Sequence, residues 1–145
     1  CGLSTAQDVA NHRQITSAVH AEGGLIAMQI LHAGRYARGA DCVSSSAIKS
    51  PISPFTPIAL DETGIEKQIA DIAACALRAQ EAGYDGVEVI GSAGYLISTF
   101  LVEKTNQRSD QWRPSRQRNA VSDCRRLPAT ACSQASGRAI HSSAV

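Results

Sequence analysis

Apolar residues along the first part of the chain follow two patterns, one typical of helices and the other of strands. Between residues 65 and 79 they recur at helical spacing, which predicts a helix with one buried face. The run 25–31 predicts an apolar strand. The run 85–90 is short, β-branched and flanked by glycines, which predicts a parallel strand buried on both faces. This order of elements predicts a βαβ unit, whose crossover is right-handed in nearly all proteins.

Capping and stop signals indicate where the helices begin and end. Ser4 and Gln7 have the spacing of a capping box, which predicts a first helix that runs until the glycine pair at 23–24. Thr63 marks the start of the second helix, and Gly83 marks its end. The intervening connection, 32–62, is long and carries three prolines, so we interpret it as a functional loop over the carboxyl ends of the strands.

Tyr95 lies just past the carboxyl end of the second predicted strand, after Gly91 and Gly94, which free the backbone to turn. In parallel α/β architectures this end of the strands is where active sites form. A phenol has a reference pKa of about 10, so it is protonated at neutral pH and can act as a general acid. Tyr95 is therefore a candidate proton donor, and packing against the loop is the alternative reading of its residue type.

Two blocks of sequence follow the two predicted strands. The first is Gln-Ile-Leu-His-Ala-Gly-Arg-Tyr at 29–36, with Ser-Ala-Ile at 46–48 and Pro-Ile at 51–52; the second is Gly-Tyr-Leu-Ile at 94–97 with Thr-Asn-Gln-Arg-Ser-Asp-Gln-Trp at 105–112. Together they resemble the Old Yellow Enzyme family of FMN-dependent oxidoreductases, most closely its NADPH-dependent 2,4-dienoyl-CoA reductase branch. The resemblance runs from about Val9 to Trp112.

The resemblance implies an α/β fold, the TIM (β/α)8 barrel, which takes about 250 residues. This chain has 145 residues. We therefore expect residues 1–112 to be a partial FMN-binding segment of such a barrel, about two βα units long. Two of eight strands leave open sheet edges, and most phosphate-binding residues of such barrels follow later strands. We expect the chain alone to be inactive, with weak or absent FMN binding.

The resemblance also implies a chemistry for matching residues. The Gln29 amide would pair with the pyrimidine edge of FMN, where a donor and an acceptor meet a carbonyl and a ring nitrogen. FMN reduced by NAD(P)H would deliver hydride to the β carbon of an activated alkene such as an enoyl thioester. Tyr95 would donate a proton to the α carbon. His32 and Arg35 would contact flavin phosphate or substrate, or would hold the loop through backbone hydrogen bonds.

Several residues depart from the family pattern or have a structural interpretation. Many relatives place a histidine or asparagine pair, which grips a substrate carbonyl, where this chain has Ile90 and Ala93. This difference leaves the substrate class open. Arg108 and Asp110 are close enough in sequence for a structural ion pair. Ser98 also departs from the family pattern, because an asparagine is usual at this position. We interpret His12 and His20 as surface or core histidines.

The last part of the chain differs from the rest in charge and composition. Residues 1–112 hold eight Lys plus Arg against twelve Asp plus Glu, whereas residues 113–145 hold six Arg against Asp123 alone. The segment 113–145 has no Lys, Glu or aromatic residue, so it cannot build a core. We expect an aberrant and disordered tail.

A change of reading frame would explain this tail. Shifting the codons of 119–123 by one base makes Met-Arg-Phe-Pro readable, which is the sequence that the family resemblance leads us to expect. The same shift over 138–141 makes Arg-Phe-Ile readable, which resembles the start of the next barrel strand. A rival interpretation is noncatalytic: the arginines of the tail would bind nucleic acid or another anionic partner. Because the tail has no stacking aromatics and no binding motif, this interpretation is less favoured than the enzyme, and nucleic acid is not an expected partner.

Composition limits the remaining function classes. The five cysteines are scattered without the close pairing of zinc or iron–sulfur ligands, so we expect reduced thiols, no metal site and no iron–sulfur ligands in this chain. No apolar run approaches the roughly 20 residues of a membrane span, and no basic and then apolar signal segment is present. The sequence therefore predicts a cytoplasmic protein, and it carries no indication of oligomeric state.

Overall fold

The computed structural model describes residues 2–114, which divide into two compact units. The first, called here the strand unit, comprises residues 2–30 and 68–89. The second, called here the loop unit, comprises residues 31–67 and 90–114. One helix, α2 (Glu62–Glu81), has residues in both units.

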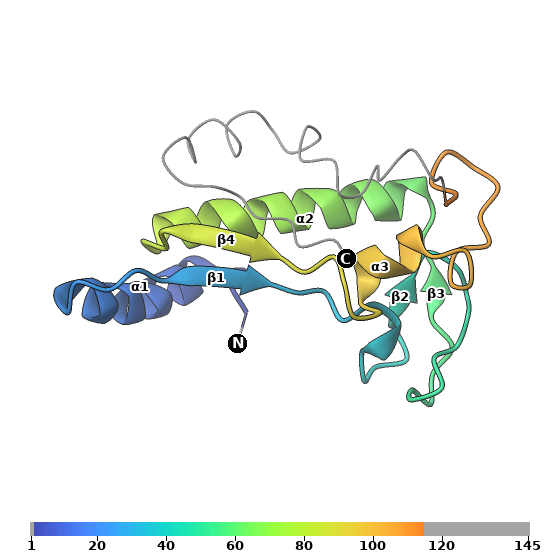
Figure 1. The fold of residues 1–145 in the computed structure, drawn as a ribbon, viewed down its shortest axis with the longest axis horizontal. Helices are drawn as coiled ribbons and strands as arrows, with labels where there is room; N and C mark the ends of the chain where they lie inside the picture. The colour runs from blue at the N-terminus through green and yellow to red at the C-terminus, as the bar shows by residue number, and fades with distance from the viewer. Residues whose placement is uncertain (1, 115–145) are drawn as a thin grey trace. The chain divides into compact units, whose positions relative to one another are not determined.

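The strand unit contains the predicted strand, helix and parallel strand. Strand β1 (Ala27–Ile30) and strand β4 (Gly86–Val89) lie side by side and run in the same direction (Figure 1). Their register pairs Ala27 with Gly86 and Ile30 with Val89. Helix α1 (Ala6–Ala21) precedes β1, and α2 precedes β4. This confirms the α/β class and the βαβ order expected from the sequence.

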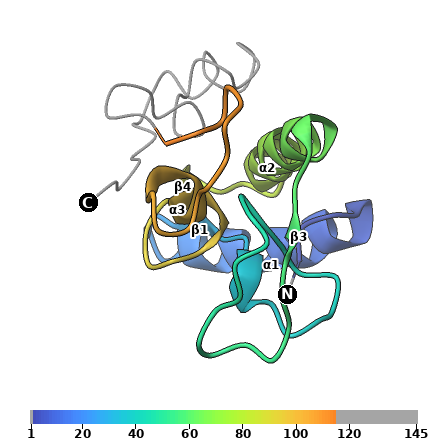
Figure 2. The same cartoon turned by 90° about the vertical axis from the view of Figure 1, so that its right-hand side faces the viewer.

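The core of the strand unit lies on one face of its two strands. The register pairs Met28 with Val87 and Gln29 with Glu88. Since side chains alternate along a strand, the first pair faces one side and the second pair faces the other. Figure 2 shows α1 and α2 on the same side of the strands. The side chains of Met28 and Val87 pack there against a buried cluster: Leu3, Val9, Ala79 and Ala82.

The strands are less buried than the sequence predicted. All four residues of β4 are half-buried, and in β1 only Ile30 is buried. The prediction that 85–90 is buried on both faces is wrong for the described part of the chain. Helices cover only the Met28 face, and polar side chains occupy the opposite face. That polar face is the one on which Gln29 lies.

Helix α1 begins one residue later than predicted. Thr5, rather than Ser4, is the N-cap: its hydroxyl accepts a hydrogen bond from the Asp8 N–H, and the Asp8 carboxylate accepts one from the Thr5 N–H. These reciprocal bonds form a capping box with aspartate in place of the expected Gln7. At the other end Gly23 has φ +73°, which confirms that the glycine pair ends the helix.

Helix α2 begins at Glu62, one residue before the predicted Thr63. The Asp61 carboxylate accepts a 2.7 Å hydrogen bond from the N–H of Gly64, which satisfies a donor of the first turn. Gly83 follows the end of the helix with φ +89°, as predicted. A Cβ at this position would lie 3.1 Å from the Thr16 hydroxyl, which itself donates a 2.6 Å hydrogen bond to the Ala82 carbonyl.

The loop unit contains more regular structure than the long loop that we predicted for 32–62. A 3-10 turn, η1 (Gly34–Tyr36), is followed by two strands of two residues each that pair in parallel. They are β2 (Val43–Ser44) and β3 (Ile58–Ala59). The unit ends with helix α3 (Leu96–Leu101) and the segment 102–114. Strands this short have no readable sequence period.

Buried polar side chains hold the loop unit together. The Ser45 hydroxyl lies 2.7 Å from the Thr99 carbonyl and 2.9 Å from the Thr105 carbonyl. The Asn106 side-chain amide donates to the carbonyls of Phe100 and Trp112, at 2.8 and 2.9 Å. The Ser45 bonds join the loop to α3 and to the segment after it, and the Asn106 bonds hold that segment against the end of α3. The second sequence block therefore acts as a brace for the loop. No described helix is long and apolar enough to cross a membrane.

Candidate functional site

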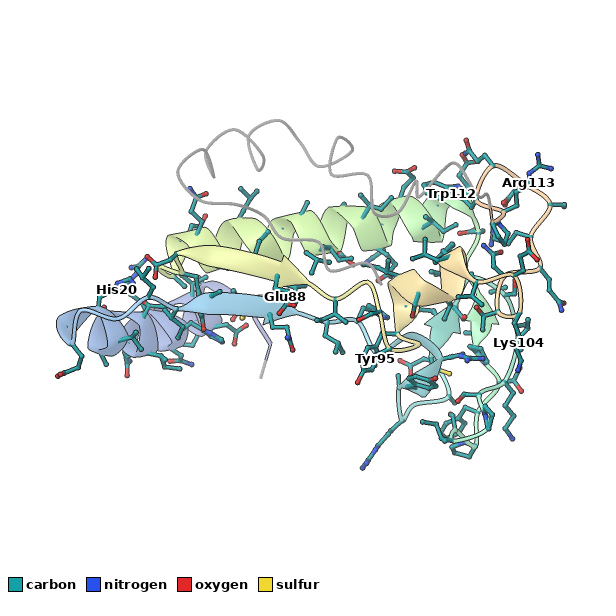
Figure 3. The ribbon with its side chains drawn as sticks, viewed as in Figure 1. His20, Glu88, Tyr95, Lys104, Trp112 and Arg113 are labelled. Atoms are coloured by element: carbon teal, nitrogen blue, oxygen red, sulfur yellow. The ribbon has the colours of Figure 1, made fainter. Side chains whose placement is uncertain are left out.

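Gln29 lies on the polar face of the strand unit, directly opposite Glu88 in the register of β1 and β4. Its side-chain NH2 group donates a 2.8 Å hydrogen bond to the Glu88 carboxylate. Gln29 is exposed and Glu88 is half-buried among the described residues. Figure 3 marks Glu88 on β4. The bond to Glu88 uses one of the two N–H groups of the amide. The carbonyl oxygen and the second N–H remain available to a ligand.

This arrangement at Gln29 fits one edge of a flavin. The pyrimidine edge of an isoalloxazine ring carries carbonyl acceptors next to a ring N–H, and an amide with one acceptor and one donor complements it. Such a pairing would orient the isoalloxazine ring of the flavin. The register that places Glu88 beside Gln29 joins residues 59 positions apart, so sequence reasoning found Gln29 but missed its partner.

Tyr95 lies in the loop unit as the N-cap residue of α3, with an extended backbone (φ −70°, ψ −179°; Figure 3). Its half-buried ring meets the Tyr36 ring edge to face, with 5.9 Å between the centroids and an interplanar angle of 79°. The next residue, Leu96, donates its N–H to the His32 carbonyl at 3.1 Å. Tyr95 therefore packs against the loop, and among the described residues its hydroxyl has no hydrogen-bond partner.

The turn before Tyr95 is tightly constrained. Gly94 has φ +81°, and a Cβ there would lie 2.4 Å from the Tyr36 hydroxyl oxygen. Only glycine allows this approach, which explains the glycine that the sequence places before the tyrosine. Ala93 has φ +60°, a left-handed conformation that glycine and asparagine tolerate better than alanine. The departure from the family pattern at Ala93 thus falls on a strained backbone position.

His32 forms a backbone hydrogen bond of the kind that we considered as its structural alternative, whereas Arg35 contacts an aromatic ring. The His32 Nδ1 accepts a 3.0 Å hydrogen bond from the Gly34 N–H. The Arg35 guanidinium lies over the Tyr36 ring, 5.4 Å from its centroid. The Nε of Arg35 is buried without a hydrogen-bond partner among residues 2–114. A contact of either side chain with flavin or substrate stays a prediction.

A cavity of about 420 Å³ adjoins Tyr36 within the loop unit. Sequence reasoning missed it because its walls come from two stretches of the connection that share no local motif. It combines aromatic, apolar and cationic side chains and so suits a ligand with an aromatic group and negative charge. The lining residues are Tyr36, Ala37, Arg38, Ile52, Ser53, Pro54 and Phe55.

Arg108 and Asp110 form the predicted ion pair, with 3.0 Å between the Arg108 Nε and a carboxylate oxygen of Asp110. The hydrogen bond from Arg108 lowers the pKa of Asp110, and the N–H of Trp112 adds to this effect. Arg108 also donates to the carbonyls of Ser45 and Leu60. The pair therefore braces the loop, as the structural interpretation predicted.

We interpret His12, His20 and Cys75 as structural residues, because of their contacts or their burial. His12 and Tyr84 share a 2.8 Å hydrogen bond, and the His20 Nε2 lies 2.9 Å from the Asp85 carboxylate. Burial raises the pKa of the Cys75 thiol, so this thiol is a poor nucleophile at neutral pH. Within residues 2–114 no three His, Cys, Asp or Glu side chains gather closely enough to hold a metal ion.

Comparison with known families identifies the family of this chain. Residues 1–121 match the NADH:flavin oxidoreductase / NADH oxidase family. This chain belongs to that family. The match covers both sequence blocks and extends past Trp112, where we placed the end of the resemblance. Membership of the Old Yellow Enzyme family is thereby confirmed, while the 2,4-dienoyl-CoA reductase branch stays a prediction.

The chain is similar to proteins of several kinds within the family. A metal reductase of Desulforamulus reducens is 46% identical over 104 residues, which are 69% of this chain and 16% of that protein. Morphinone reductase in complex with tetrahydroNAD is 32% identical with a TM-score of 0.75, covering 79% of this chain and 37% of that one. 2-Naphthoyl-CoA reductase in complex with 2-naphthoyl-CoA is 30% identical with a TM-score of 0.71, covering 79% and 20%.

These similarities confirm the TIM-barrel fold class expected from the sequence. The matched region covers between about a sixth and slightly more than a third of the length of these three proteins. Gln29 belongs to the strand unit, whereas Tyr95, His32 and Arg35 belong to the loop unit. The tail from residue 115 onward, including the reading-frame hypothesis and the anionic-partner alternative, lies outside the described residues.

Proposed function

We propose that this chain carries part of the active site of an FMN-dependent ene reductase that uses NAD(P)H as its electron source. The observation that carries this proposal is the Gln29 amide, which keeps a carbonyl oxygen and an N–H on the polar face of a family-matched strand pair. The complex of morphinone reductase with tetrahydroNAD supports a nicotinamide as the electron donor.

The proposed substrates are activated alkenes, with enoyl thioesters of the 2,4-dienoyl-CoA type as the first choice. The likeness to a reductase that is complexed with 2-naphthoyl-CoA supports a thioester. The cavity beside Tyr36 also supports it, because Arg38, Tyr36 and Phe55 suit a ligand with a purine ring and phosphates.

Two residues of this chain have proposed roles in the reaction. FMN, when bound and reduced, supplies a hydride to the β carbon of the alkene. Gln29 orients the flavin ring through its amide. Tyr95 transfers its phenolic proton to the α carbon, for which its N-cap position and its packed ring provide a fixed orientation. His32 and Arg35 shape the loop on which the Tyr95 ring packs, and we propose contact with substrate or flavin phosphate as their secondary role.

The sequence allows either weak or absent FMN binding by the chain of 145 residues on its own. Because this chain forms the strand pair that carries Gln29, weak binding without reductase activity is the proposed outcome. It spans about a third of the length of morphinone reductase. Apolar side chains at both ends of β1 are exposed, with 65% of Leu25 and 44% of Leu31 accessible. Such surfaces are normally covered by neighbouring strands in a closed barrel, which also supplies the phosphate-binding loops.

FMN binding to the purified chain tests this proposal. The side-chain amide of Gln29 is followed by NMR during titration with FMN, and Gln29→Ala is compared with Gln14→Ala, which removes an exposed glutamine of α1. We expect FMN to perturb Gln29 with weak affinity, and Gln29→Ala alone to reduce binding. The absence of any perturbation would refute a flavin site here. A stoichiometric yellow complex would instead refute the weakness of binding.

A further inference from the structure

The pair formed by Gln29 and Glu88 has a feature that the proposed flavin contact does not require. Gln29 and Glu88 are register partners on adjacent parallel strands, and both lie on the face opposite the packed Met28 and Val87. The 2.8 Å bond runs from the NH2 group of Gln29 to a carboxylate that can only accept hydrogen bonds when ionised. The neighbour of Gln29 therefore distinguishes the two ends of its amide.

An isolated glutamine amide does not have a fixed order of donor and acceptor. Its oxygen and nitrogen have nearly the same size, so rotation by half a turn exchanges them with little steric change. Beside a carboxylate, one of these orientations gains a charge-assisted hydrogen bond, and the other places a carbonyl oxygen against an anion. Glu88 thus favours the orientation that is observed at Gln29.

We propose that Glu88 is a positioning residue for the flavin: it sets the order in which Gln29 presents its acceptor and donor to the pyrimidine edge. This inference rests on the proposed function, because it needs a ligand edge with a fixed order of donors and acceptors. With the reversed amide, the N–H of Gln29 would face the ring N–H, and its oxygen would face a flavin carbonyl. Removing this wrong orientation before binding raises affinity without adding a contact.

The alternative is that Glu88 serves only the strand pair. Cross-strand hydrogen bonds stabilise sheets, and a glutamate on a polar strand face needs no further role. The two interpretations differ in one respect. If Glu88 only stabilises the sheet, its replacement should not change FMN affinity through Gln29. If Glu88 is a positioning residue, its replacement should change FMN affinity only while the Gln29 amide is present.

Glu88→Gln is the variant that separates these interpretations. Glutamine has the same size as glutamate and can still bond to Gln29, but it offers both a donor and an acceptor, so either orientation of Gln29 becomes satisfied. Fold retention is checked from the backbone NMR spectrum. Glu22→Gln is the control, because it removes the same charge from an exposed cap residue of α1 in the same unit.

Two measurements on the full chain give the result. In the free protein, Glu88→Gln should shift the side-chain amide resonances of Gln29, and Glu22→Gln should leave them unchanged. In the titration with FMN, Glu88→Gln should weaken binding about twofold, because about half of the molecules then present the reversed amide of Gln29 to the flavin. In a Gln29→Ala background, Glu88→Gln should have no further effect on the Kd, because the amide through which it acts is gone.

Each contrary outcome has its own meaning. Unchanged Gln29 resonances in Glu88→Gln would overturn the positioning role even before FMN is added. An equal loss of affinity in the presence and in the absence of Gln29 would also overturn it, since Glu88 would then act on FMN independently. No FMN binding by the wild-type chain would refute the proposed function, and the flavin role of Glu88 would fall with it, whatever the amide resonances show.

Discussion

The ring and the hydroxyl of Tyr95 contribute differently to the protein. The ring contacts Tyr36 edge to face and sits on a constrained glycine turn, whereas the hydroxyl has no partner among the described residues. Position after a strand pointed to this residue, and the contact with Tyr36 could not be read from the sequence. The packing alternative and the proton-donor role are therefore compatible, because they use different atoms.

Tyr95→Phe separates these two contributions. In a flavin-loaded enzyme that contains this segment, we expect alkene reduction to slow by about a hundredfold or more, because the general acid is gone while the ring contact remains. Flavin reduction by NAD(P)H should keep its rate. Stopped-flow measurement of the two half-reactions checks this. The control is Tyr84→Phe, which loses a hydrogen bond to His12; equal slowing in both variants would contradict the role of Tyr95.

Ala93 offers a test of backbone strain next to the candidate acid. Its φ of +60° costs an alanine about 1 kcal/mol relative to glycine. We therefore expect Ala93→Gly to raise the free energy of unfolding by about that amount, as measured by urea denaturation. Ala70→Gly, in the exposed interior of α2, should lower it by a similar amount. Destabilisation by both variants would show that the turn at Ala93 is unstrained in solution.

At the scale of elements, the capping box of α1 makes stability depend on pH. The N–H of Ser4, then the hydroxyl and N–H of Thr5, lower the pKa of Asp8 below its ordinary value of 3.8. A depressed pKa in the folded state gives stability that is present above pH 3.8 and is lost as the pH falls through the folded value.

Asp8→Asn should remove this pH dependence. We expect the variant to melt at a lower temperature than the wild type at neutral pH, and the difference in Tm to shrink progressively below pH 3.8. Thermal melts followed by circular dichroism over this range check the expectation. Glu22→Gln, at the other end of α1, should keep the acid-dependent loss of the wild type. A Tm difference that stays constant down to low pH would mean that the Asp8 carboxylate does not stabilise the cap.

Element boundaries could be predicted to within one residue for α1 and α2, because glycine and capping side chains act over a single turn. Ser4 was predicted as the N-cap, whereas Thr5 is observed. Both side chains can cap a helix, and which of them does so depends on where the backbone enters the helix. Strands β2 and β3 were not predicted. They have two residues each, and their pairing depends on chain segments that only the fold brings together.

For the whole molecule, the reading frame beyond Trp112 decides how far the family relationship extends. The family match ends at residue 121, which is within the segment 119–123 where a one-base shift would make Met-Arg-Phe-Pro readable. We propose that residues 113–145 result from such a shift. Sequencing the gene across codons 105–145 should then reveal a reading frame that contains Met-Arg-Phe-Pro. A confirmed frame as written would contradict the proposal.

The sequence by itself determined the order of helices and strands in the strand unit, the family, and the place of Tyr95 and Gln29 after or within their strands. These features follow from local periodicity, from the φ angles that glycine allows, and from motifs of consecutive residues. Only the tertiary structure decided that Glu88 pairs with Gln29, that Tyr36 packs on Tyr95 and that Arg108 braces the loop. Such contacts join residues about 50 or more positions apart, and strand register and loop packing, which set them, leave no local pattern in the chain.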